Sequence, residues 1–306
     1  MTEESVQTRT ATWRDYYDLC KPKVVMLLLL TAIVGVVLAS PPGDISIFVL
    51  VMSSLGIGLA ASAGAAINQI VERENDAKMA RTEGRPMPQG KVSQQNAFIF
   101  AVMMAAASVF ILTGFINVLT AVLTFASMIG YAVIYTMYLK KATPQNIVIG
   151  GLAGATPPLL GWTSVTNSID PHGLLLVLII YTWTPPHFWA LAIHRRDDYA
   201  RVNLPMLPVT HGVEFTKYSI LGYTILMILV TILPYLAYMR GLIYLVAALV
   251  LGGYFLYMVL KLMFAEQPNT AIKTFVYSIN YLMLLFIAMV VDHYFNDDLM
   301  RLLFPA

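Results

Sequence analysis

The sequence has little charge and almost no cysteine. Only 12% of its 306 residues are charged, whereas 58% are hydrophobic, and no long polar block interrupts the chain. One soluble core cannot bury so many apolar side chains, so a soluble domain of ordinary composition is excluded. Alternating segments of about ten residues, which would indicate a membrane barrel, are also missing. The single cysteine, Cys20, excludes an intramolecular disulfide and a thiolate metal cluster.

Long apolar runs are what the sequence has instead. Nine runs of about 20 residues are each long enough to cross a hydrocarbon layer of about 30 Å as a helix. They cover roughly residues 24–40, 45–67, 97–116, 118–139, 146–163, 173–193, 218–238, 242–264 and 274–294. The sequence therefore predicts an all-α membrane protein with nine transmembrane helices.

Basic residues predict the orientation. If the N-terminus lies inside, the inner segments hold all of the 19 lysines and arginines except Arg240 and Arg301. We therefore expect a cytoplasmic segment at residues 1–23, a single transmembrane domain at 24–295 and an external tail at 296–306. The first segment is partly acidic, unlike a transit peptide, which favours the plasma (inner) membrane of a prokaryote.

Two of the predicted cytoplasmic loops, residues 68–94 and 194–217, are much longer than the external connections. Long loops in a compact bundle usually carry function. The two loops also resemble each other, because each begins with acidic residues and ends in a Pro-Met-Pro or Pro-Met-Leu-Pro run. We expect two acidic patches that face each other across one mouth.

The first of these loops begins with a metal-binding pattern. Asn68, Glu72 and Asp76 recur at four-residue intervals, so they lie along one stripe of a helix. Their oxygens suit Mg²⁺, which binds through one or two carboxylates while it keeps waters and substrate phosphate oxygens. Basic residues that can neutralise phosphate follow at once, namely Lys78, Arg81 and Arg85. Each residue alone also fits an ordinary solvated helix end, but together they indicate a diphosphate site.

Two stretches resemble a known family. The first motif of the UbiA superfamily of intramembrane prenyltransferases is similar to Asn68-x3-Glu72-x3-Asp76-x-Lys78-x2-Arg81-x3-Arg85-Pro86. The haem-farnesylating branch of that superfamily resembles the stretch Pro185-Pro186-His187-Phe188-x8-Asp197-Asp198-Tyr199-x5-Pro205-Met-Leu-Pro208. Further matches include Lys21-Pro22, and the similarity covers essentially the whole chain.

This resemblance implies a fold and a reaction. The fold would be a bundle of nine transmembrane helices around a central cavity that opens to the cytoplasmic side. The reaction would be Mg²⁺-dependent transfer of a farnesyl group from farnesyl diphosphate to a vinyl group of haem B, giving haem O and diphosphate. It would serve haem O and haem A synthesis for terminal oxidases. The partners would be these substrates, the lipid bilayer and a downstream haem-modifying enzyme or oxidase assembly, with no nucleic acid.

The resemblance also assigns residue roles. Asp76, Asp198, His187 and Tyr135 would be catalytic. The ligands of Mg²⁺ would be Asn68, Glu72, Asp76, Asp197 and Asp198. Substrate would be bound by Lys78, Arg81, Arg85, Lys140, Lys141, Arg196, Tyr199, Trp183 and Phe188. Glu72 stands where the superfamily commonly has Asp, and Asp197 and Asp198 point about 100° apart on a helix. Direct ligation by Glu72 therefore stays open, and Asp198 is favoured over Asp197 because it belongs to the Asp-Tyr pair.

His187 directly follows two prolines in the sixth predicted span. Pro185 and Pro186 are expected to interrupt the sixth span and to free the carbonyls of Tyr181 and Thr182. An irregular backbone at membrane depth needs protein or a wet cavity beside it, and an ionisable group there is a functional candidate. We therefore predict that His187 contacts haem or its reacting vinyl group. A second pair, Pro157-Pro158, is expected to kink the fifth span.

Three other interpretations stay open. A different UbiA-type prenyltransferase, acting on an aromatic or quinone precursor, would share the first acidic patch but is not expected to carry the Pro-Pro-His-Phe stretch. A membrane haem protein of the electron-transfer class would need paired axial histidines on facing helices. A transporter would be indicated by broken helices near the middle of the membrane.

Overall fold

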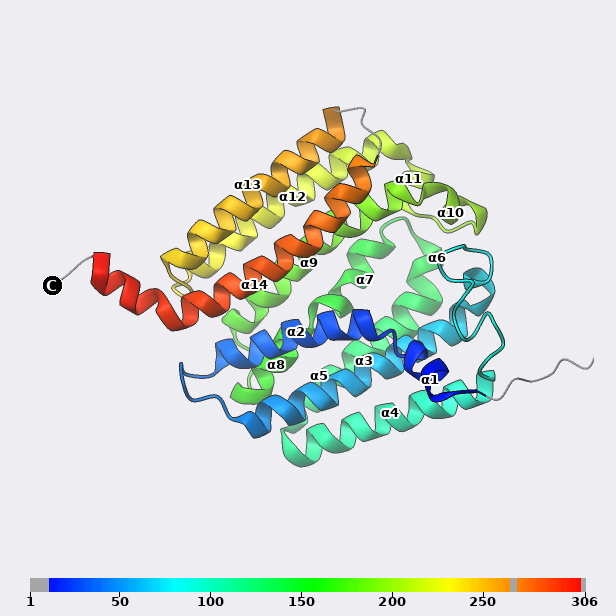
Figure 1. Cartoon of the computed structure of the whole chain (residues 1–306), viewed down its shortest axis with the longest axis horizontal. Coiled ribbons are helices and arrows are strands. Elements are labelled where there is room, and N and C mark those ends of the chain that lie inside the picture. Colours follow the sequence, from blue (N-terminus) through cyan, green and yellow to red (C-terminus); the bar gives the residue numbers. More distant parts are fainter. Residues whose placement is uncertain (1–10, 265–268, 304–306) are drawn as a thin grey trace, which may run out of the picture.

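The computed structural model describes residues 11–264 and 269–303, and only the backbone for residues 297–303. Every regular element in these ranges is a helix (Figure 1). In chain order they are α1 (Trp13–Leu19), α2 (Pro22–Ala39), α3 (Ile47–Asp76), α4 (Gln94–Phe115), α5 (Val118–Ile129), the π-helix η1 (Gly130–Leu139), α6 (Lys140–Ala142), α7 (Asn146–Ala155), α8 (Pro157–Thr166), α9 (Pro171–His194), α10 (Arg196–Arg201), α11 (Leu207–Thr210), α12 (Gly212–Leu236), α13 (Leu242–Phe264) and α14 (Thr270–Leu303).

Long apolar helices confirm a multi-pass, all-α membrane protein. Within the described residues, eight helices are long and apolar enough to cross a membrane. They are Pro22–Ala39, Ile47–Asp76, Gln94–Phe115, Val118–Ala142, Pro171–His194, Gly212–Leu236, Leu242–Phe264 and Thr270–Asn296. The span Val118–Ala142 joins α5, η1 and α6 into one continuous rod. These eight match eight of the nine predicted runs.

The remaining run, residues 146–163, forms two short helices, as its prolines predict. α7 ends at Ala155 and α8 begins at Pro157, and each has 10 residues. Proline at position 157 has no N–H to donate to the carbonyl of Ala153. The hydroxyls of Thr156 and Ser127 lie 2.9 and 3.0 Å from that carbonyl and 2.7 Å from each other, so one of them donates to the carbonyl and the other to its neighbour. The kink is therefore stabilised by local hydroxyls, while a ninth crossing by this helix pair stays a prediction.

The expected interruption at Pro185 and Pro186 is wrong. α9 continues without a break from Pro171 to His194, with both prolines inside it. Prolines are tolerated in membrane helices where neighbouring helices and hydroxyl side chains support the backbone. α9 packs against α7, α12 and α14, and the Thr182 and Thr184 hydroxyls donate to carbonyls of the preceding turn. Tertiary contacts therefore outweigh the loss of two backbone hydrogen bonds.

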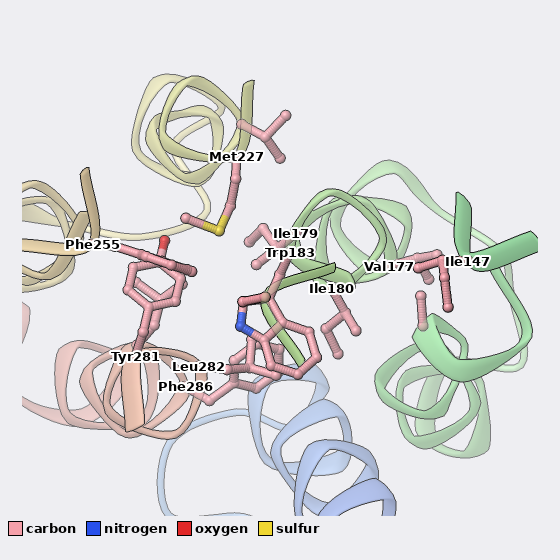
Figure 2. Packing of buried hydrophobic residues seen from close by; sticks show 14 of the residues in the cluster. Ile147, Val177, Ile179, Ile180, Trp183, Met227, Phe255, Tyr281, Leu282 and Phe286 are labelled. Atoms are coloured by element: carbon pink, nitrogen blue, oxygen red, sulfur yellow. The ribbon is translucent and has the colours of Figure 1, made fainter. Parts of the chain in front are cut away.

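The bundle has one large core and smaller satellite clusters. The large core joins α9, α12, α13 and α14, and Figure 2 shows Trp183 of α9 among Leu282 and Phe286 of α14. Elsewhere α2 and α8 cross so closely that a Cβ atom on Gly35 would strike the Pro158 carbonyl, so this crossing requires glycine.

The polar connections gather at one end of the bundle. Figure 1 shows α1, the loop of residues 77–93, α6, α10 and α11 together at the right-hand end. This is the end that the basic residues predict to be cytoplasmic. Residues 1–10 of the predicted cytoplasmic segment and residues 304–306 of the predicted tail lie outside the described residues, and α14 continues to Leu303.

Candidate functional site

The first acidic patch occupies the last turns of α3. This helix has 30 residues, more than a membrane crossing needs, so its final turns extend into the polar end of the bundle. Asn68, Glu72 and Asp76 lie there as predicted along one stripe, and all three are buried, with exposed fractions of 2%, 7% and 1%. Carboxylates are rarely buried without a partner. The contacts of these three side chains therefore decide what the patch can do.

The π-helix η1 and the start of α6, which follows it directly, supply two of those contacts in register. The Asn68 amide donates to Thr136 Oγ1 at 3.1 Å, and Lys140 Nζ forms an ion pair with Glu72. Both pairs join residues 68 positions apart, so η1 runs parallel to α3 with a constant offset. Thr136 Oγ1 in turn donates to the Tyr131 carbonyl, five residues earlier, at 2.8 Å. Thr136 of η1 and Lys140, the first residue of α6, thus face α3, and π-helical turns such as η1 are frequently found at functional sites.

Each of the three α3 side chains is bound by one basic residue from elsewhere in the chain. Lys21 Nζ donates to Asn68 Oδ1, Lys140 pairs with Glu72, and Arg85 Nη1 lies 2.6 Å from Asp76 Oδ2. The bases come from three separate segments: Lys21 precedes α2, Lys140 begins α6, and Arg85 lies in the loop after α3. Three buried side-chain oxygens and three basic side chains therefore converge at the end of α3.

The loop of residues 77–93 is attached to the bundle on both sides of Arg85. The Thr82 hydroxyl donates to the Asp76 carbonyl at 2.9 Å. Further on, Met87 and Val92 are buried in a cluster with Leu19. These contacts attach both ends of the loop to the bundle, so the Arg85 guanidinium is held beside Asp76.

Lys21 is a site residue that sequence reasoning missed. It precedes Pro22 with a left-handed backbone, φ 50°, and this turns its side chain back onto α3. Burial, together with the nearby charges of Arg85 and Lys140, lowers the pKa of Lys21 to about 7, against the opposite effect of the acidic residues. The sequence feature that could have identified Lys21 is its position directly before Pro22, the proline that begins a span.

The second acidic patch is less enclosed. Asp198 of α10 has a side-chain exposure of 19% and lies 3.5 Å from Arg195 and 3.7 Å from Arg201. Asp197 is exposed, as expected for a neighbour about 100° away on a helix. Between the patches lies Tyr199, which is buried.

Tyr199 connects the two patches electrostatically. Burial raises the pKa of the Tyr199 hydroxyl. Glu72 of the first patch and Asp198 of the second raise this pKa further, whereas Arg81 and Arg195 lower it. Charges from both loops thus act on one buried hydroxyl. Both loops therefore lie near Tyr199, at the same end of the bundle (Figure 1), which we call the mouth.

Other predicted substrate-binding bases lie outside this cluster. Lys78, Arg81, Lys141 and Arg196 are exposed, and none of them forms an ion pair with another residue in the described part of the chain. Arg81 is close enough to act on Tyr199, whereas the other three lie within 4 Å of no carboxylate in the described part of the chain.

The predicted aromatic residues form two groups. Tyr135 of η1 stacks on Tyr131 at 6.0 Å between ring centroids, and its ring lies where a Cβ atom on Gly150 would sit. Trp183 is buried against α14, where its indole donates to the Ser278 carbonyl at 2.8 Å. The Phe188 ring is 41% exposed.

His187 belongs to the second aromatic group. It is 7% exposed, with its ring between Trp183 and Phe275, and the edge of Phe188 meets it at 4.8 Å. Its Nδ1 lies 2.6 Å from Ser278 Oγ. This aromatic cluster at the contact between α9 and α14 contains no ion pair among the described residues, in contrast to the mouth.

The side chains at the end of α3 provide oxygen ligands that a metal could use. No group of three or more His, Cys, Asp or Glu side chains forms a ready metal cage within residues 11–264 and 269–303. Mg²⁺ does not need one, because it usually takes one or two carboxylates and completes its shell with water and phosphate oxygens. Buried carboxylates beside Lys and Arg therefore fit a phosphate ligand that arrives with its metal.

Comparison with known sequences gives a consistent result. A model described as the UbiA prenyltransferase family matches residues 28–289. Protoheme IX farnesyltransferase 2 of Pseudoalteromonas atlantica is 61% identical over 282 residues, which cover 92% of each chain. Protoheme IX farnesyltransferase of Teredinibacter turnerae is 56% identical over 287 residues, covering 94% of this chain and 92% of the relative.

Solved structures share the fold at low sequence identity. A structure described as digeranylgeranylglyceryl phosphate synthase matches with a TM-score of 0.76 at 19% identity, and covers 92% of this chain and 98% of that one. A UbiA homologue from Archaeoglobus fulgidus, bound to DMAPP and Mg²⁺, matches with a TM-score of 0.62 at 16% identity, and covers 90% and 99%.

Proposed function

Since this chain belongs to the UbiA prenyltransferase family, in which it is a prenyltransferase, we propose that it transfers a farnesyl group from farnesyl diphosphate to a vinyl group of haem B, giving haem O and diphosphate. The two relatives compared above, at 61% and 56% identity, are named for farnesyl transfer to protoheme IX. The observation that carries the proposal is the convergence of Asn68, Glu72 and Asp76 with three buried or half-buried bases.

The donor set fits Mg²⁺. Asp76, Glu72 and Asn68 would hold the ion from α3, and Asp198 or Asp197 would reach it from α10. When bound, Mg²⁺ would supply Lewis-acid stabilisation of the departing diphosphate. The Archaeoglobus fulgidus relative, described as bound to DMAPP and Mg²⁺, supports this choice of metal.

The bases around α3 would exchange partners when substrate enters. Lys21, Lys140 and Arg85 each contact an oxygen of the candidate ligands. Once those oxygens face a metal, the three cations become available to diphosphate oxygens, for which Arg provides paired donors and Lys a compact charge. The negative charge that develops on the leaving group is thus met by cations that are already in place, and such preorganisation is the main source of electrostatic catalysis.

The apolar bundle would protect the reactive carbon. In the reaction, the bond between C1 of the farnesyl group and oxygen breaks, and its electron pair leaves with diphosphate. Aromatic faces such as those of Tyr135 and Phe188 would stabilise the allylic cation, whereas the buried Trp183 ring is stacked on His187. The π pair of the haem vinyl group then forms the new carbon–carbon bond. A water molecule adds to the resulting cation and loses a proton, which completes the hydroxyethyl group.

The proposed setting is the plasma (inner) membrane of a prokaryote. The mouth would face the cytoplasm, where farnesyl diphosphate is soluble, and the external end of the bundle would carry residues 296–306. The product remains a membrane-bound haem, so a haem-modifying enzyme or an oxidase under assembly would receive it.

The test is direct synthesis by the purified chain. Haem B, Mg²⁺ and prenyl diphosphates of C10, C15 and C20 are incubated with the protein, and the hydroxyethylprenyl haem is sought by mass. We expect product from the C15 substrate, and loss of product with Asp76→Asn. Glu74→Gln is the matched control, because Glu74 lies near the end of the same helix with its side chain 81% exposed.

Two outcomes would contradict the proposal. One is the absence of prenylated haem from active, folded wild-type protein. The other is prenylation of an aromatic quinone precursor in place of haem, which would support the other UbiA-type activity.

A further inference from the structure

The imidazole of His187 is held rigidly by two aromatic rings. Trp183 stacks on it with ring centroids 4.2 Å apart and planes inclined by 21°, and Phe275 stacks at 4.5 Å and 28°. One ring comes from α9 and the other from α14, so the imidazole joins the two helices. A ring covered on both faces cannot rotate about its Cβ–Cγ bond without moving its neighbours. The directions of its two nitrogens are therefore set by packing.

Ser278 determines which of these nitrogens carries the proton. Its Oγ lies 2.6 Å from the Phe275 carbonyl oxygen, to which it donates, and also 2.6 Å from His187 Nδ1. Two oxygens approach this closely only with a hydrogen between them, so the single hydroxyl hydrogen is already used. Oγ must then accept from Nδ1–H. In the neutral imidazole this leaves Nε2 unprotonated, with its lone pair available.

Nε2 of His187 has no hydrogen-bond partner among the described residues. Unlike the indole nitrogen of Trp189, which is fully buried without a partner, Nε2 of His187 keeps some accessible surface. Nε2 is therefore not completely covered, and part of the 7% exposure of His187 belongs to this atom. A donated Nδ1–H and an open Nε2 are the features of a metal-ligating histidine, whose second nitrogen is oriented by a neighbouring acceptor.

We propose that Nε2 of His187 ligates the iron of the haem acceptor, and that Ser278 is a positioning residue that fixes the tautomer for this bond. The inference rests on the proposed function, because it takes haem as the acceptor. The iron–nitrogen bond lies in the plane of the imidazole, so the clamp by Trp183 and Phe275 would also set the tilt of the macrocycle. His187 precedes the end of α9 at His194 by seven residues, about 10 Å along the axis. The iron would thus lie deeper than the charged mouth.

The other four histidines lack this arrangement. His293 Nε2 donates to the Ser40 carbonyl, so the corresponding nitrogen is occupied. His211 is exposed and bonded through Nδ1 to Thr210, His194 is exposed at the end of α9, and His172 lies near the opposite end beside Trp162. The structure therefore distinguishes one candidate among the five.

The test is spectroscopic and uses the full chain in detergent or lipid nanodiscs with haem B. We expect the wild type to show the absorption and resonance Raman bands of histidine-ligated haem, and His187→Ala to lose them. Added imidazole should restore a ligated spectrum in His187→Ala by entering the vacated space. Binding of a non-reactive thiol analogue of farnesyl diphosphate, retained in the variant, shows that the bundle is intact. His211→Ala is the control and should keep the wild-type spectrum.

Ser278→Ala tests whether Ser278 orients His187 through its hydroxyl or only packs against it. It should retain haem but shift the iron–histidine stretching band and lower haem affinity by about 10-fold, the usual effect of losing the group that orients a metal-bound histidine. Ser278→Thr keeps the hydroxyl and should retain the wild-type band. An unchanged iron–histidine band in Ser278→Ala, or an unchanged spectrum in His187→Ala, overturns the inference.

Failure of the inference and failure of the proposed function give different results. If wild-type protein produces prenylated haem while His187→Ala keeps the wild-type haem spectrum, the function stands and the ligand assignment falls. If wild-type protein binds haem through His187 but transfers no prenyl group, the proposed function falls.

Discussion

The two acidic patches of the mouth obtain their basic partners in different ways. On α3, Asn68 and Glu72 are met by Lys21 and Lys140, from 47 and 68 residues away, and the carboxylates are buried. On α10, Asp198 meets bases only three residues away on either side and keeps 19% of its side chain exposed. The first patch therefore depends on the whole bundle, whereas the second can rearrange with one short helix. We expect the first to carry most of the catalytic electrostatics.

The largest effect is expected from Asp76→Asn. The change removes a charged ligand from a buried position, and loss of one preorganised electrostatic group typically costs about 100- to 1,000-fold in rate. The kcat/KM for farnesyl transfer measures it, with Glu74→Gln as the unaffected control. A loss below about 10-fold would show that α3 does not dominate the mouth.

Lys140→Met is expected to destabilise the folded chain. It leaves Glu72 without its partner at a site where both side chains are largely buried, and breaking such a pair costs about 3 kcal/mol. Thermal unfolding of the detergent-solubilised variant measures the loss.

The matched double variant Glu72→Gln with Lys140→Met separates stability from activity at this pair. It should regain most of the stability, because no unpaired charge remains buried, yet stay inactive. Recovery of activity in the double variant would contradict a role of this pair in diphosphate binding.

Asp198→Asn is expected to cost less than Asp76→Asn, at about 10-fold in kcat/KM, since its partners are local and partly solvated. Titration of activity against Mg²⁺ should show a weaker apparent affinity with kcat nearly retained. If Asp198→Asn equals or exceeds the loss of Asp76→Asn, the ranking of the two patches is reversed.

Thr136→Val tests the register between η1 and α3. The Asn68 amide loses its acceptor, and leaving a buried donor unpaired costs about 1 kcal/mol, or roughly five-fold in farnesyl transfer if the site carries the whole cost. Thr136→Ser, which keeps the hydroxyl, is the control. Equal activity of the two variants would mean that this hydrogen bond does not position Asn68.

The smallest effects are expected from exposed bases. Lys141→Gln and Arg196→Gln should each change kcat/KM by less than about two-fold, because a solvated charge without a partner contributes little. A loss of about 10-fold from either variant would show that substrate binding draws these side chains into the mouth.

Much of the fold and of the first patch could be predicted from local patterns. The four-residue spacing of Asn68, Glu72 and Asp76 places them on one stripe of any helix, and eight apolar runs became spanning helices. Pro157 separated α7 from α8 because it has no N–H to donate, and the nearby hydroxyls of Ser127 and Thr156 compensate for the lost hydrogen bond. At Pro185 and Pro186 the same reasoning failed, because packing on three sides keeps α9 continuous.

By itself the sequence determined the helical membrane architecture, the acidic stripe and the basic end of the bundle, because hydrophobic length and helical period act over a few turns. Only the tertiary structure decided which base meets which acid, that Lys21 belongs to the mouth, and which nitrogen of His187 is open. These outcomes depend on segments up to 91 residues apart, on the π-helical phase of η1 and on the contact between α9 and α14. No local sequence pattern predicts contacts between segments so far apart in the chain, since these contacts are set by how whole helices pack.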